Sequence, residues 1–251
     1  MERAFAAVLL VLTLGCRGVE KYPEYFWEPP DGEPTTDGGS PVRTDGGSPV
    51  RRVTVSGQVL DSSSTALEGM TFCVYEEGPE SCVTTGADGR YSLTLPADTN
   101  TGLLGEKAGY PKLFRLLRLS GNRVLTTLVA ANDTEAAVNY TTMGAAYPLG
   151  EDGALTISAA DPATCSALSP SAGVGPIYLN EYGAPDLALI AMSTSHTATF
   201  AKLPPGDYEG DVRHPSMICS VADGWGWPSN THSFRARVLA GYETFIAPWC
   251  H

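Results

Sequence analysis

The stretch that most constrains the fold of this chain is residues 84–96, Thr-Thr-Gly-Ala-Asp-Gly-Arg-Tyr-Ser-Leu-Thr-Leu-Pro. Asp88-Gly89 is typical of a tight hairpin turn, because glycine accepts the positive φ that such a turn needs. Residues 90–95 then alternate between polar and apolar side chains, which predicts a strand with one buried face. Pro96 has no backbone N–H and is expected to end that strand.

Three segments around this stretch resemble the carboxypeptidase regulatory-like (transthyretin-like) domain. They are Gly57-Gln58-Val59, residues 67–72 (Leu-Glu-Gly-Met-Thr-Phe) and residues 85–93 (Thr-Gly-Ala-Asp-Gly-Arg-Tyr-Ser-Leu). The patterns of that family run G-x-V, L-x-G-V-x-V and T-x-x-D-G-x-Y-x-L, and Met70 stands here where valine is usual. The resemblance implies a β-sandwich accessory module without catalytic residues, so it carries no site over to this chain.

Composition extends this prediction to the whole chain. The 251 residues leave room for one large or two small domains, and glycine and proline are abundant, at 27 and 19 residues. Long helical patterns are scarce, which favours an all-β fold with many turns. We expect two transthyretin-like or Ig-like Greek-key β-sandwich domains with a short connecting helix. The formal net charge of −12 argues against nucleic acid as a partner, because nucleic-acid binders present a basic face.

Residues 1–16 are predicted to be a bacterial lipoprotein signal peptide. The apolar run at 4–14 is too short to span a bilayer. Leu-Thr-Leu-Gly-Cys at 12–16 resembles a lipobox, with Thr13 where that family usually has leucine. The resemblance implies that Cys16 is lipidated and anchors the protein in the membrane, and Arg17 after it favours the outer membrane by analogy. The alternative is ordinary secretion, with Cys16 inside a discarded peptide.

Residues 17–52 are predicted to be a disordered tether. The octapeptide Thr-Asp-Gly-Gly-Ser-Pro-Val-Arg occurs at 36–43 and again at 44–51. Such a segment buries too little apolar surface to offset the entropy of ordering it.

The rest of the chain divides into three predicted parts. Residues 53–131 form the carboxypeptidase regulatory-like sandwich, and residues 132–146 form the connecting helix, with Asp133 as its cap. Residues 147–251 are interpreted as a second, divergent β-sandwich.

The cysteines predict disulfides, because an exported protein lies in an oxidising compartment. Cys73 and Cys82 flank a predicted turn at a spacing suited to a cross-strand bridge. Cys219 and Cys250 lie on predicted late strands and form the most plausible second pair, which leaves Cys165 over. Cys165 paired with Cys250 is an alternative that the sequence does not exclude. A Cys/His metal cluster is a further alternative, but we expect no metal and no cofactor.

Enzyme motifs are weak in this sequence. Residues 205–208 (Pro-Gly-Asp-Tyr) and 213–215 (Arg-His-Pro) resemble part of the intradiol dioxygenase layout, in which two tyrosines and two histidines bind iron. The His-x-His pair of that family is absent, and His232 lies too far along the chain. No Gly-x-Ser-x-Gly motif is present. We therefore expect a protein that is not an enzyme, with a metal-dependent enzyme as the distant alternative.

Trp225 and Trp227 are the candidate ligand-binding residues. They lie in Asp-Gly-Trp-Gly-Trp-Pro at 223–228, where glycine and proline indicate an exposed loop. Exposed indole rings suit sugar rings or peptide surfaces. The alternative is that one tryptophan folds back over the end of the sandwich.

These features predict a non-catalytic lipoprotein of the bacterial envelope, at the cell surface or in the periplasm. It would act as an interaction or structural module, with an unknown envelope protein or glycan as its partner. The alternative function is a carbohydrate-binding module that uses the Trp225/Trp227 loop.

Overall fold

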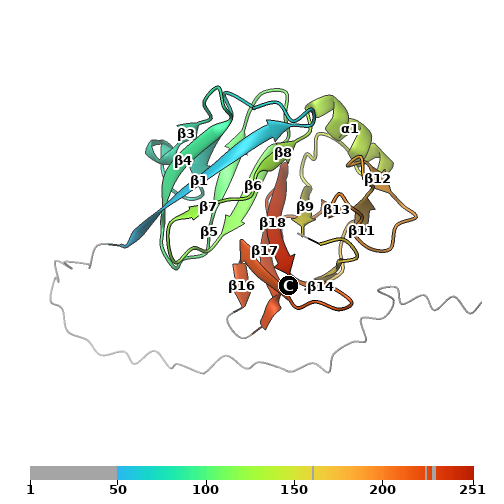
Figure 1. The fold of residues 1–251 in the computed structure, drawn as a ribbon. Helices are drawn as coiled ribbons and strands as arrows, with labels where there is room; N and C mark the ends of the chain where they lie inside the picture. Colours follow the sequence, from blue (N-terminus) through green and yellow to red (C-terminus); the bar gives the residue numbers. More distant parts are fainter. Residues whose placement is uncertain (1–49, 160, 224, 228–229) are drawn as a thin grey trace, which may run out of the picture. The chain divides into compact units, whose positions relative to one another are not determined.

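The computed structural model describes residues 50–251, apart from 160, 224, 228 and 229, and no side chains at 221–223, 226–227 and 230–232. The predicted signal peptide, Cys16 and nearly all of the tether lie outside the described residues. Within them, β-strands dominate and a single α-helix occurs, so the all-β prediction is confirmed (Figure 1). None of the helical structure described there has the length and apolar character needed to cross a membrane.

The strands form three sheets. The first small sheet has the order β4–β1–β7, with β8 also pairing β1; its strands are β1 (Arg52–Asp61), β4 (Arg90–Pro96), β7 (Arg123–Val124) and β8 (Leu128–Ala130). The second small sheet has the order β10–β14–β17–β16; its strands are β10 (Cys165–Ser169), β14 (Gly206–Arg213), β16 (Trp225–Trp227) and β17 (Asn230–Val238).

The third sheet has ten strands in the order β12–β11–β13–β9–β18–β6–β5–β2–β3, with β15 also pairing β18. Its strands are β2 (Thr71–Val74), β3 (Val83–Thr84), β5 (Thr101–Glu106), β6 (Lys112–Leu117), β9 (Gly153–Ser158), β11 (Val174–Leu179), β12 (Pro185–Asp186), β13 (Thr197–Leu203), β15 (Cys219–Asp223) and β18 (Tyr242–Cys250). A 3-10 turn, Pro79–Ser81, follows β2, and helix α1 (Asp133–Thr142) lies between β8 and β9.

Strand β18 joins the two predicted sandwiches. It pairs in parallel with β6 on one side and with β9 on the other, so the red strand lies between the green and the yellow one in Figure 1. Glu243 of β18 is in register with Leu113 of β6 and with Ala154 of β9. Strand pairing therefore crosses from residues 53–131 into residues 147–251, and Pro49–His251 form one compact unit.

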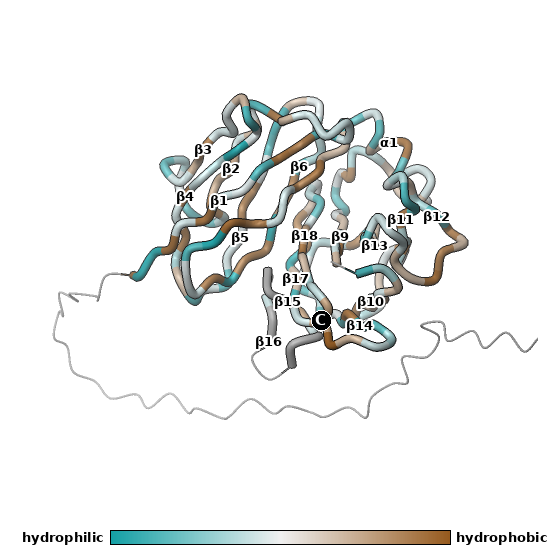
Figure 2. Tube along the Cα trace, viewed as in Figure 1, coloured by the Kyte–Doolittle hydropathy of each residue, from teal (hydrophilic) through white to brown (hydrophobic). Residues whose placement is uncertain are grey.

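The large sheet buries a different core on each face. Along β6, Phe114 and Leu116 belong to a cluster with the second small sheet, whereas Leu113 and Leu117 belong to a cluster with the first small sheet. Successive side chains of a strand point to opposite faces, so the two clusters lie on opposite sides of the sheet. Figure 2 shows the apolar stretches along β5 and β6.

The prediction for residues 84–96 was half right. Strand β4 runs over Arg90–Pro96 with alternating burial, and Gly89 has a φ of +71°. The predicted hairpin is wrong, because β3 pairs with β2 in the large sheet and β4 pairs with β1 in the first small sheet. Buried Thr85 holds the chain before the turn: its hydroxyl donates to the Leu67 carbonyl at 2.6 Å. The turn therefore carries the chain from one sheet to the other.

Sequence reasoning missed strand β5. Its residues are buried almost continuously, so they show no alternation. Gly102 and Gly105 lie where the rings of Phe114 and Phe72 cross the strand, and a Cβ on Gly102 would be 2.3 Å from the Phe114 ring. Glycine weakens a strand pattern but permits this close packing.

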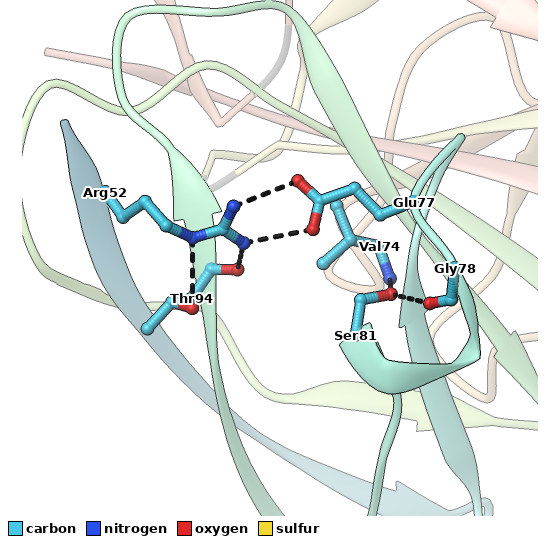
Figure 3. Close-up of polar contacts among 6 residues, drawn as sticks. All are labelled: Arg52, Val74, Glu77, Gly78, Ser81 and Thr94. Carbon is cyan, nitrogen blue, oxygen red and sulfur yellow. Dashed lines mark hydrogen bonds and ion pairs between the residues drawn. The ribbon is translucent and has the colours of Figure 1, made fainter. Parts of the chain in front are cut away.

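The loop after β2 is fastened to the first small sheet through polar contacts. Arg52 of β1 donates to both carboxylate oxygens of Glu77, at 3.2 and 3.0 Å, and to the carbonyl of Thr94 at 2.8 Å (Figure 3). Ser81 donates within the same loop, to the carbonyl of Gly78 at 2.7 Å. The loop therefore has a defined position beside β1 and β4.

Candidate functional site

A cleft of about 510 Å³ lies beside helix α1 on the ten-stranded sheet. Its floor is the face of β6, β18, β9 and β13 that is turned away from the second small sheet. This face carries Thr156 and Ser158 on β9, because Leu155 and Ile157 point into the opposite core. Strand β8 and residues 179–184 contribute the walls.

A row of hydrogen-bonded polar groups crosses the floor. Thr156 donates its hydroxyl proton to Oε1 of Glu243 at 2.6 Å. The Thr199 hydroxyl lies 3.1 Å from that of Thr156, and Thr199 is therefore the donor in this second bond. Thr199 and Thr156 are direct partners in the register of β13 and β9, and Glu243 is on the adjacent strand β18. Three neighbouring strands thus fix the positions of the three side chains.

Glu243 is the titratable group at the centre of this row. Glu243 is half-buried, and desolvation of its carboxyl raises the pKa, while the hydrogen bond from Thr156 and the nearby Tyr140 hydroxyl oppose the rise. Burial also raises the pKa of Tyr140, and the negative charge of Glu243 adds to that effect. The Tyr140 hydroxyl is buried and forms no well-aligned hydrogen bond with any residue that the structure describes. The cleft therefore holds a carboxyl whose ionised form is costly and whose neighbours are neutral donors.

A capping box stabilises the N-terminus of helix α1, which lies beside the cleft. The Asn132 side chain accepts hydrogen bonds from the backbone N–H groups of Thr134 and Glu135 at 3.0 Å, and Glu135 accepts one from the Asn132 N–H at 3.0 Å. The predicted cap at Asp133 is therefore wrong, because Asp133 is already in the first turn. Its carboxylate instead accepts a hydrogen bond from the Tyr147 hydroxyl.

Hydroxyl groups also line much of the rest of the cleft. They come from Thr126, Thr127, Ser158, Ser195 and Thr197. Arg115 lies in the wall, 7% exposed, and donates from Nη1 to the carbonyl of Thr126 at 2.8 Å. Tyr182 lies in the lining too and is 85% exposed. Such a concave surface, mostly apolar but with a few fixed donors and acceptors, is suited to binding a ligand that carries a polar group.

The two predicted disulfides are confirmed. Cys73 is bonded to Cys82, and Cys219 is bonded to Cys250. Cys219 and Cys250 are direct partners in the register of β15 and β18, so the second bond fastens the C-terminal strand. Cys165 is buried in β10, and its alternative pairing with Cys250 is wrong because Cys250 is bonded to Cys219. None of these cysteines lines the cleft.

The predicted exposure of Trp225 is wrong. Trp225 lies in strand β16, is 7% exposed and belongs to the core cluster of the second small sheet. Its Nε1 donates to the carbonyl of Thr101 at 2.8 Å, and the guanidinium of Arg237 lies 5.6 Å from the centre of its ring. The ring thus covers the core and its N–H is satisfied, which is the alternative that the sequence left open. The side chain of Trp227 lies outside the described residues.

The residues that resemble a dioxygenase motif serve local structure. The hydroxyl of Tyr208 donates to the carbonyl of Pro204 at 2.7 Å. Nδ1 of His214 accepts hydrogen bonds from the N–H groups of Ser216 and Met217, both at 3.2 Å. In the part of the chain that the structure describes, no three His, Cys, Asp or Glu side chains are grouped so as to hold a metal ion. The side chain of His232 is not among those described.

Sequence reasoning missed the residues of the cleft floor. A glutamate in the alternating strand Tyr-Glu-Thr-Phe-Ile, at 242–246, was the one available signal, since carboxylates are rarely buried. Its partners Thr156 and Thr199 are distant in the chain. They are brought to Glu243 by the parallel pairing of β18 with β9, which has no local signature in the sequence.

No known family model matches this chain, and no curated protein does. Solved structures resemble this chain only weakly. A chain of a type II cohesin–X-dockerin complex from Acetivibrio cellulolyticus is 16% identical, with a TM-score of 0.28, over 32% of this chain and 58% of that one. A minor pilin of Streptococcus agalactiae is 13% identical, with a TM-score of 0.24, over 79% and 96%. The 3-chlorocatechol 1,2-dioxygenase of Rhodococcus opacus is 14% identical, with a TM-score of 0.23, over 27% and 43%. No function passes from these proteins to this chain.

Proposed function

We propose that this protein is a non-catalytic interaction module of the bacterial cell envelope, and that it binds its partner in the cleft beside α1. The observation that carries the proposal is the row of Thr199, Thr156 and Glu243 on the floor of the cleft. These groups are held by three paired strands and by one another, so their hydrogen-bonding positions are set before a partner arrives. Such preorganisation lowers the entropic cost of binding.

Binding, rather than catalysis, is the role that this arrangement favours. The Thr156 hydroxyl donates to the Glu243 carboxyl, which is also how a nucleophile is arranged beside its base. Thr156 is only 4% exposed, and its hydroxyl takes part in hydrogen bonds on both sides. The pair therefore braces the floor of the cleft and does not present an activated hydroxyl to a reactant.

The proposed envelope location is supported by the resemblance of residues 12–16 to a lipobox. We infer that Cys16 carries the lipid, that residues 17–52 are the tether, and that residues 53–131 are a carboxypeptidase regulatory-like module. Two or more acyl chains hold a protein on a membrane, whereas one alone does not. The test is to replace Cys16 by serine and to fractionate cells. Retention of the variant in the membrane pellet, at the wild-type level, would exclude lipid anchoring at this residue.

Partner binding in the cleft is tested by blocking it. Ser158 is exposed and lies on the cleft face of β9, so Ser158→Trp puts a large ring in the cleft without disturbing a core. Ser92→Trp is the matched control, on the exposed face of β4. Full-length variants are crosslinked in native envelopes, and the captured proteins are identified by mass spectrometry. We expect Ser158→Trp to lose a partner that wild type and Ser92→Trp both retain.

The alternative of carbohydrate binding through the Trp225/Trp227 loop is weakened by the fold. Trp225 offers no exposed ring face to a sugar. If the same experiment captures only glycan, and Ser158→Trp does not reduce its amount, the cleft is not the binding site and the proposal fails.

A further inference from the structure

We propose that the cleft recognises an alkylammonium group, such as that of a lysine side chain, with the Glu243 carboxylate as its counter-charge. This inference rests on the proposed function, which makes the cleft the binding site, and it adds the chemistry of the group that is bound.

The carboxyl of Glu243 is not neutralised by a basic side chain of the described chain. Its neighbours are the hydroxyls of Thr156 and Tyr140. The nearest basic side chain in the cleft lining, Arg115, is directed to the carbonyl of Thr126. A carboxylate offers about four acceptor positions, and the single well-aligned donor, the Thr156 hydroxyl, leaves room for more. Glu243 is half-buried, and a carboxylate withdrawn from water in this way is usually paired with a cation, so a cationic ligand group completes this site.

The surroundings of Glu243 match the three donors of an ammonium group. Thr197 on β13 and Ser158 on β9 line the cleft and bring hydroxyl oxygens that can accept hydrogen bonds. Tyr140, Tyr182 and Phe245 line the same cleft and add aromatic surface, which attracts cations and covers an alkyl chain. The formal net charge of −12 favours the approach of a cation over that of an anion.

The protonation of Glu243 links binding to pH. Burial raises the pKa of this carboxyl, and a bound ammonium group lowers it again, so binding strengthens as the pH rises through the pKa of the free site. The other charged or titratable groups that line the cleft are Arg115 on β6, Glu135 and Tyr140 on α1, and Tyr182 after β11. Tyr147 also lies close enough to Glu243 for the two groups to interact electrostatically. Arg115 donates to the carbonyl of Thr126, burial raises the pKa of Tyr140, and Glu135 accepts hydrogen bonds from Asn132 and Ser62.

The direct test is titration of the full-length chain, solubilised in detergent, with matched probes. Nα-acetyl-lysine amide carries the ammonium group, and its Nε-acetylated form is the neutral match. We expect the first to bind and the second to bind at least about tenfold more weakly, since it leaves the carboxylate uncompensated. n-Butylammonium is a third probe. Tighter binding of the lysine amide than of n-butylammonium assigns the site to a peptide lysine, and equal binding assigns it to a small amine.

Two variants tie the binding to Glu243. Glu243→Gln keeps the shape and removes the charge, and we expect it to lose about tenfold or more in affinity for both amines. Ser158→Lys supplies an ammonium group from the exposed edge of the floor, so it competes with the probe, whereas Ser158→Met fills similar space without charge. We expect Ser158→Lys to bind the probes more weakly than Ser158→Met does. This comparison does not depend on the folding of the Glu243 variant.

Equal affinity for the charged and the acetylated probe, or unchanged amine binding in Glu243→Gln, would overturn the inference. In that case, the proposed function would still stand if Ser158→Trp loses the captured partner and wild type retains it. If Ser158→Trp instead captures the partner as well as wild type does, while wild type binds the amine probes as expected, the proposed function is refuted and the ammonium site stands.

Discussion

Replacement of Trp225 tests whether this side chain belongs to the core or to a binding surface. The ring is 7% exposed within the cluster of the second small sheet, and the indole N–H donates to Thr101 of β5 at 2.8 Å. Trp225→Ala removes a large buried ring, which costs about 3–5 kcal/mol of the free energy of unfolding. Trp225→Phe keeps most of the ring but leaves the Thr101 carbonyl without this donor, which costs about 1–2 kcal/mol.

The assay is thermal unfolding of the full-length chain, followed by far-UV circular dichroism. For a folded unit of about 200 residues, 1 kcal/mol lowers Tm by roughly 2–4 °C. We therefore expect Trp225→Ala to lower Tm by roughly 6–20 °C and Trp225→Phe by roughly 2–8 °C. Trp249 is 47% exposed, so Trp249→Ala is the control and should lower Tm by only a few degrees.

The opposite pattern would refute this reasoning. If Trp225→Ala keeps the wild-type Tm but loses its envelope partner, Trp225 is an exposed binding residue. The burial and the hydrogen bond to Thr101 would then not describe the protein in solution.

Three further predictions concern the disulfides, the cleft and its helix. Loss of the Cys219–Cys250 disulfide, which closes a loop of 31 residues, should lower the free energy of unfolding by about 1 kcal/mol more than loss of Cys73–Cys82, which closes a loop of 9. The reason is that the unfolded chain gains more entropy when the longer loop is opened. Urea unfolding of the two double serine variants measures both costs, and a larger cost for the shorter loop would contradict the prediction. The raised pKa of Glu243 means that the folded state binds a proton more tightly than the unfolded state does, so the stability that this proton contributes is lost as the pH rises above the ordinary pKa of 4.5. The Tm of Glu243→Gln should therefore rise relative to that of wild type between pH 5 and pH 8. A difference in Tm that stays constant over this range would refute the prediction. Asn132→Ala removes the helix cap and should cost about 1 kcal/mol, with faster amide exchange in α1, while Thr134→Ala on the exposed side of the first turn should change little.

Local patterns in the sequence were sufficient for much of the fold. The alternation at 90–95 predicted β4, and the cysteine spacing predicted Cys73–Cys82. A helix was predicted at 132–146 and occurs at Asp133–Thr142, although Asn132 is its cap because its side chain reaches two orphan N–H groups. These features depend on neighbours in the chain, which a sequence displays directly.

Pairing between distant segments was not accessible in the same way. Asp88-Gly89 predicts a turn, but nothing local says that the strands on its two sides belong to different sheets. The glycines around Trp225 indicated a loop, whereas the contact with Thr101, far away in the chain, makes that residue part of the core. The cleft depends on the pairing of β18 with β6 and β9, and sequence therefore predicted none of its floor.

The measurement that tests the central claim most directly is site-specific photocrosslinking in native envelopes. A photoreactive amino acid is placed at Ser158 in the cleft, and in a parallel strain at Ser92 on the far strand β4. The account predicts that position 158 yields a discrete adduct with an envelope protein, that excess Nα-acetyl-lysine amide suppresses this adduct, and that position 92 yields none. An adduct at position 92 but not at position 158 would contradict the claim that the cleft is the binding site.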